Sequence, residues 1–158
     1  MRDLEPQGVR KLLCRFGITL KWLEDTAAIK GSFWGAPEAG IVRSSVHVRA
    51  DTPVHSFLHE TCHIICMAPD IRDQLAGDAA SDDLEEAAVC YLQILLADLL
   101  PTVGRDRLMS DMDAWGYSFR LGSARHWFEF DAEDARNWLL QYQLIDESDC
   151  PGGNVRQR

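Results

Sequence analysis

Three residues of this chain, His59, Glu60 and His63, have the types and the spacing of a metal-dependent hydrolase. Residues four apart share one face of a helix, with Cβ atoms about 5–6 Å apart, so the two histidines can bind one metal ion. Glu60 lies about one residue farther round the helix, where it can accept a proton from a metal-bound water as general base. A buried helix that carries these residues by chance is the alternative. We favour a metal site because chance would have to place three residues together.

Two histidines do not complete a catalytic zinc site, which usually has three protein ligands and one water. Residues 82–100 have a strongly helix-forming composition and offer Glu85 and Glu86, which point about 100° apart on a helix. Asp82 as N-cap with Glu85 three residues later approximates a capping box, in which Glu85 binds the backbone of the cap. This leaves Glu86 as the favoured third ligand, with Glu85 as the alternative.

Other ligand sets use further residues of the same two helices. Cys62, Cys66 and Cys90 are possible thiolate ligands, although small buried cysteines on core helices are commoner. His55, His59 and His63 form an i, i+4, i+8 row. One straight helix cannot wrap three ligands tetrahedrally around an ion, which weakens this set.

The segment 117–130 contains candidates for stabilising the oxyanion that forms when water attacks a carbonyl. Tyr117, Arg125 and His126 have suitable side chains, and we favour His126 because Trp127 and Phe128 would anchor it. Metal-bound histidines usually donate their second ring N–H to a carboxylate. The candidates for that role are Asp82, Asp83 and Asp98.

The elements that position these residues follow from apolar periodicity. Helices are expected over residues 6–16, 53–68, 82–100 and 103–115, and from Asp131 onward. Strands are expected over residues 18–22, 29–34 and 41–49, and two short ones within 117–130. Asp51 or Thr52 should cap the helix that carries the histidines, with Pro53 as its first residue. The strand over residues 41–49 could hold an extended peptide by main-chain pairing.

Length and charge limit the class of protein. The 158 residues predict a single domain over residues 1–145, with residues 146–158 as a disordered tail. The chain has 16 basic and 25 acidic residues, and its net charge of -9 argues against binding nucleic acid or an anionic membrane. Five cysteines without a close-set framework indicate reduced thiols, and the N-terminus lacks a secretion signal. We therefore expect a cytoplasmic protein.

The pattern resembles the gluzincin-type zincin metallopeptidases, and among them the small ImmA/IrrE-like group. The resemblance covers roughly residues 41–101 and depends on HETCH at 59–63 and EAAVCYLQILLADLLP at 86–101. It implies zinc ligands at His59, His63 and Glu86 with Glu60 as catalytic base. It also implies an α+β fold with an N-terminal helix, a small three-stranded sheet, two central metal-binding helices and C-terminal helices. Cys90-Tyr91 departs from the Phe-Ala of the group, and Cys62 replaces its usual glycine.

These observations predict a zinc-dependent peptidase whose substrate is a protein or peptide. The alternative is a non-catalytic, metal-stabilised domain that binds other proteins in regulation. A structural metal site would close its fourth position with a protein ligand, such as Cys62, Cys66 or His55. An open, water-filled position would indicate catalysis.

Overall fold

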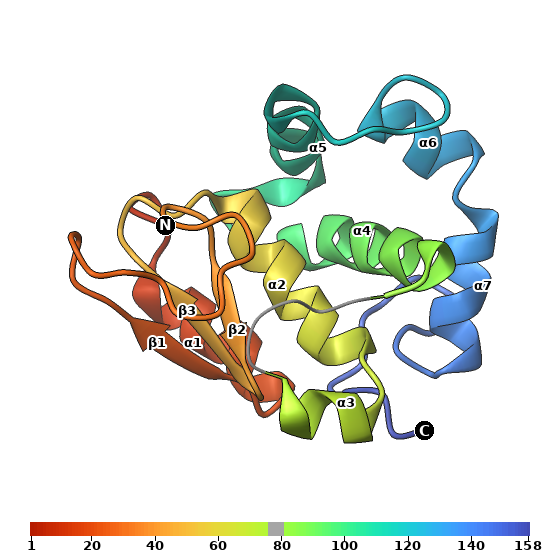
Figure 1. Cartoon of the computed structure of the whole chain (residues 1–158). Helices are drawn as coiled ribbons and strands as arrows, with labels where there is room; N and C mark the ends of the chain where they lie inside the picture. Colours follow the sequence, from red (N-terminus) through yellow and green to blue (C-terminus); the bar gives the residue numbers. More distant parts are fainter. Residues whose placement is uncertain (76–80) are drawn as a thin grey trace.

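The computed structural model describes residues 1–75 and 81–158. In these residues the fold is α+β, with seven helices and one three-stranded mixed sheet (Figure 1). The N-terminal part consists of α1 (Pro6–Arg15), β1 (Thr19–Trp22), β2 (Gly40–Val42) and β3 (Ser45–Val48). The helices that follow are α2 (Val54–Cys66), α3 (Pro69–Gln74), α4 (Asp83–Ala97), α5 (Gly104–Trp115), α6 (Ala124–Phe130) and α7 (Glu133–Gln141). None of the described helices is long and apolar enough to cross a membrane.

The sheet has β3 at its centre, parallel to β1 and antiparallel to β2. The expected single strand over residues 41–49 is therefore wrong, because a turn at Arg43, which has a φ of 53°, divides it into a hairpin. The expected strand over residues 29–34 is also wrong, since this segment forms turns. The backbone N–H of Ile41 on β2 donates to the carbonyl of Gly31, which occupies part of the edge that we expected to pair with a peptide.

Helix α4 lies at the centre of the helical part, in contact with α2, α5 and α7 (Figure 1). Its expected packing stripe is confirmed at Ala88, Tyr91 and Leu95, which are all buried. Leu84 was expected in the same stripe but is 42% exposed, because it lies in the first turn, beyond the packed part of the helix. Asp82 caps α4 as expected, accepting hydrogen bonds from the backbone N–H groups of Leu84 and Glu85.

The start of α2 differs from the prediction in its cap. Pro53 is the N-cap residue, not the first helical residue, and no side chain caps this helix. The Thr52 hydroxyl instead accepts a hydrogen bond from the Arg49 backbone N–H, and Asp51 forms an ion pair with the Arg49 side chain. Both candidate caps are therefore used by the turn that joins β3 to α2.

The C-terminal third contains helix where strands were expected. Residues 124–130 form α6 because the Ser123 hydroxyl caps it, accepting a hydrogen bond from the His126 backbone N–H. Asp131 ends α6 and does not cap α7, which begins after Ala132. The expectation of a disordered tail is wrong as well. Pro151 forms a β-bridge with Ile145, and the Arg156 backbone N–H donates to Ile65 at the end of α2.

Candidate metal centre

The candidate site lies between α2 and α4, which pack side by side (Figure 1). Helix α2 is anchored in the core by fully buried apolar side chains: Phe57, Leu58, Ile64 and Ile65. This packing directs the face that carries His59 and His63 toward the first turn of α4. The cap by Asp82 fixes that turn and places Glu86 opposite the two histidines.

The three side chains meet at distances suited to a metal ion. The Nε2 atoms of His59 and His63 are 3.1 Å apart. Glu86 Oε1 lies 3.3 Å from His59 Nε2, and Glu86 Oε2 lies 3.4 Å from His63 Nε2. A tetrahedral zinc ion with bonds of about 2.0–2.1 Å separates its ligand atoms by about 3.3 Å. The structure therefore brings together the three residues that the sequence predicts as ligands, with the spacing of three corners of a zinc tetrahedron.

The donor set also fits a zinc site with one open position. Among the described residues, the group that could hold a metal contains His59, His63 and Glu86 and no fourth histidine, cysteine or carboxylate. The Cys62, Cys66 and Cys90 thiols, whose pKa is raised by burial, do not belong to this group. Two imidazoles and one carboxylate with an open corner is one of the ligand sets found in catalytic zinc sites.

Gln93 on α4 orients the first histidine. Its Oε1 atom lies 2.9 Å from His59 Nδ1, and because an amide oxygen accepts hydrogen bonds, this contact favours the tautomer with the proton on Nδ1. His59 Nε2 is then unprotonated and directed at His63 and Glu86, as a metal ligand requires. The partner of His59 is therefore a buried amide and not one of the expected aspartates. Asp82 caps α4, and Asp98 pairs with Arg105.

Burial keeps both candidate ligands neutral. It lowers the pKa of His59, although the Glu86 carboxylate acts in the opposite direction. Burial and the neighbouring His59 lower the pKa of His63 to about 3. No hydrogen-bond partner for His63 Nδ1 is found within the described residues. Because protons compete poorly for these nitrogens, the pair is ready for a metal ion near neutral pH.

A cleft of about 480 Å³ opens over the three groups and is also lined by Glu60 and Tyr117. Glu60 therefore faces the same cavity as the candidate ligands, as a general base must. The Tyr117 ring lies edge to face with His59, with their centroids 5.7 Å apart. Burial raises the pKa of the Tyr117 hydroxyl far above its ordinary value, so that it stays protonated and can donate a hydrogen bond.

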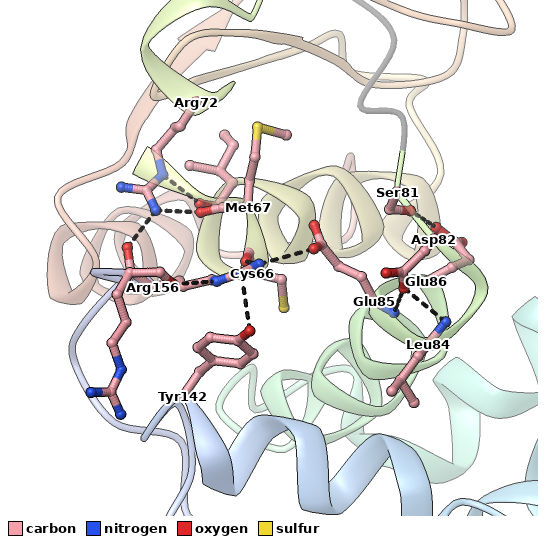
Figure 2. A network of polar contacts seen from close by, with 12 residues as sticks. Cys66, Met67, Arg72, Ser81, Asp82, Leu84, Glu85, Glu86, Tyr142 and Arg156 are labelled. Atoms are coloured by element: carbon pink, nitrogen blue, oxygen red, sulfur yellow. Dashed lines mark hydrogen bonds and ion pairs between the residues drawn. The ribbon is translucent and has the colours of Figure 1, made fainter. Parts of the chain in front are cut away.

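Two arginines tie the end of α2 to the start of α4 (Figure 2). Arg72 from α3 donates to the carbonyls of Ile64 and Met67 and to the carbonyl of Arg156. Arg156 donates to the carbonyl of Cys66 and forms a 3.0 Å ion pair with Glu85 on α4. The C-terminal segment thus joins the end of α2 to the first turn of α4, next to Glu86.

The ion pair between Arg156 and Glu85 changes the reason why Glu86, and not Glu85, is the third candidate ligand. Glu85 does not take part in a capping box, since its carboxylate pairs with Arg156. Glu86 instead accepts a hydrogen bond from the Ser81 hydroxyl and faces the two histidines. The two neighbouring carboxylates are separated because they point to different sides of α4, as their 100° spacing predicts.

Several candidate residues lie away from the site. His126, our favoured oxyanion stabiliser, is exposed on α6 next to Phe130 and does not line the cleft. Arg125 pairs with Asp106 and Glu129. Arg125 and His126 were both expected on a strand but lie on a helix. Because Trp127 on that helix is buried, its two neighbours point away from the cleft. His55 lines the cleft but is not part of the metal group.

The sequence analysis did not identify Gln93 or Arg156. Gln93 had a usable signal, because it lies seven residues after Glu86 and so on the same helix face. Arg156 had no such signal, since its partners on α2 and α4 lie 90 and 71 residues away in the sequence. No known protein family, curated protein or solved structure matches this chain.

Proposed function

We propose that this protein is a zinc-dependent peptidase of the zincin type, related to the ImmA/IrrE-like group. One observation carries the proposal: Nε2 of His59, Nε2 of His63 and the Glu86 carboxylate lie 3.1 to 3.4 Å apart, at the spacing of zinc ligands. The open cleft above them supports access for a substrate. The proposed substrate is a peptide segment of a protein, and the proposed location is the cytoplasm.

Bound zinc would polarise the scissile carbonyl and lower the pKa of a water molecule at the open position. In the proposed reaction, Glu60 accepts a proton from the attacking water and later returns it to the leaving amine. Its place in the sequence, next to His59 and one residue round the helix, supports this role. His59, His63 and Glu86 serve as ligands, and Gln93 fixes the ring of His59 in the required tautomer.

Tyr117 takes the proposed role of oxyanion stabiliser in place of His126. Its ring contacts His59 and it lines the cleft, whereas His126 lies on the outer face of α6. The raised pKa of its hydroxyl favours the protonated form, which can donate a hydrogen bond to a developing negative charge. Tyr117 is therefore the proposed oxyanion stabiliser, and not His126, which the sequence analysis favoured.

The decisive experiment compares the wild-type protein with Glu60→Gln. We expect about one zinc ion per chain in both proteins, and cleavage of a mixed peptide library that falls at least about 100-fold in the variant. Glu24→Gln, an exposed position away from the cleft, is the matched control and should cleave normally. Undiminished cleavage by Glu60→Gln would refute the assigned base. Zinc binding without any cleavage by the wild type would favour the non-catalytic domain instead.

A further inference from the structure

Three large aromatic side chains stand exposed along one wall of the cleft. Phe33, Trp34 and Trp115, here called the aromatic shelf, are 63%, 68% and 42% exposed. Their rings follow one another edge to face, with centroids 5.0 Å apart for Phe33 and Trp34 and 5.7 Å for Trp34 and Trp115. All three line the cleft that contains the candidate metal ligands. Contiguous exposed aromatic surface of this kind marks a binding site more often than a packing defect.

The loop that carries Phe33 and Trp34 is fixed to the fold at both ends. The Gly31 carbonyl accepts the backbone N–H of Ile41, at a close approach where a Cβ atom on Gly31 would collide with the Ile41 carbonyl. After the two aromatic residues, the Ala39 backbone N–H donates to the Ser56 hydroxyl on α2, in a buried bond of 2.9 Å. The shelf is thus attached to the helix that carries His59 and His63.

A carboxylate lies at the edge of the shelf. Glu38 accepts a hydrogen bond from the indole N–H of Trp115 at 3.2 Å, and its charge also acts on the neighbouring His55. Together with Glu60 and Glu86, it gives the cleft lining three acidic side chains, with no lysine or arginine among its described residues. The wall therefore combines aromatic faces with negative charge.

We propose that the aromatic shelf and Glu38 bind an arginine side chain of the substrate, a proposal that rests on the peptidase function above. A guanidinium group stacks on aromatic faces, best on tryptophan, and pairs with a carboxylate in the same plane. A neutral apolar side chain would cover the Glu38 carboxylate without compensating its charge. An acidic side chain would be repelled by Glu38. The shelf thus selects a basic segment of the partner protein, in line with the net charge of -9.

Binding can be measured without hydrolysis in the zinc-loaded Glu60→Gln protein. The probes are alanine-serine peptides with a single central arginine, citrulline, lysine, leucine or glutamate, and the readouts are calorimetry and the fluorescence of Trp34 and Trp115. Citrulline has the shape of arginine without its charge. We expect the arginine peptide to bind about tenfold more tightly than the citrulline peptide, with a preference that weakens as salt is raised.

Two matched pairs of variants locate the preference. Glu38→Gln can still accept the Trp115 N–H but has no charge, so it should remove the difference between arginine and citrulline, whereas Glu24→Gln should keep it. Trp34→Ala should weaken binding of the arginine peptide by about fivefold or more. Trp22→Ala removes a tryptophan that is 45% exposed but lies outside the cleft, and should leave binding unchanged.

The outcomes separate this proposal from the peptidase function. Equal affinity for arginine and citrulline, tighter binding of leucine, no measurable binding of the arginine peptide, or an unchanged preference in Glu38→Gln would each overturn the arginine site. Discrimination by a protein whose wild type cleaves no peptide would uphold the arginine site and refute the peptidase function. Cleavage without any preference for arginine would uphold the peptidase function and refute the arginine site.

Discussion

Replacing Arg156 with alanine would test whether the C-terminal segment holds α2 and α4 together. Its guanidinium pairs with Glu85, donates to the Cys66 carbonyl and the Tyr142 hydroxyl, and stacks 4.0 Å from the centre of the Tyr142 ring (Figure 2). The side chains of Arg156 and Glu85 are only 15% and 17% exposed. Burial raises the pKa of Glu85 and Arg156 opposes that shift, so the variant leaves a carboxylate partly buried without its counter-charge.

The expected loss of unfolding free energy follows from this burial. Removing one partner of a fully buried ion pair costs about 3–5 kcal/mol, and the remaining access to water reduces the expected loss here to about 2–3 kcal/mol. For a chain of this size, that loss lowers the melting temperature by about 4–12 °C. Because Glu85 adjoins Glu86, we also expect weaker zinc binding. Thermal unfolding of the metal-free protein and a competitive zinc titration measure the two effects separately.

The control is Arg10→Ala, at an exposed position on α1, which should change the unfolding free energy by less than about 0.5 kcal/mol. Adding Glu85→Gln to Arg156→Ala should recover part of the lost stability, since it removes the unpaired charge. The reasoning is refuted if Arg156→Ala unfolds like the wild type, or if the second substitution adds its full cost to the first.

Four further predictions concern the site itself. Glu86→Gln should weaken zinc binding at least about 100-fold in a competitive titration, whereas an unchanged affinity would remove Glu86 from the ligand set. Gln93→Leu should cost about tenfold in zinc affinity by releasing the His59 ring, and equal affinity would refute that role. Tyr117→Phe should keep zinc but lower kcat about 100-fold with little change in KM, and an unchanged kcat would exclude the oxyanion role. His63, whose pKa is lowered to about 3, binds a proton in the unfolded chain below its ordinary value of 6.5 but not in the fold. The metal-free wild type should therefore lose stability as the pH falls from 6.5 toward 3, by up to about 1.4 kcal/mol per pH unit more than His63→Gln, and parallel pH curves for the two proteins would contradict this.

The helical part of the site could be predicted because its signals are local. Helices α2 and α4 follow from local features: the spacing of His59 and His63, the cap at Asp82, and the apolar residues of each helix. None of these needs long-range information. The 100° between neighbouring residues also separated Glu85 from Glu86, although the partner assigned to Glu85 was wrong. Helix periodicity thus predicts which side chains share a face, but not what each of them meets.

The parts of the fold that the sequence did not predict depend on contacts between distant segments. Residues 41–49 alternate like one strand, and the turn at Arg43 carries no glycine or proline to reveal the hairpin. Residues 117–130 are aromatic enough to suggest strands, but the cap from Ser123 selects a helix and turns His126 outward. The C-terminal segment has a polar composition typical of disorder, and contacts with distant parts of the fold, among them α2, α3 and α4, hold it in place.

X-ray absorption at the zinc edge of the loaded protein would test the central claim most directly, because it identifies the atoms bound to the metal. A site built from His59, His63, Glu86 and a water should show only nitrogen and oxygen ligands, at about 2.0–2.2 Å, with the scattering of two imidazoles. A sulfur ligand at about 2.3 Å, or the scattering of a third imidazole, would contradict this ligand set and the open position with it.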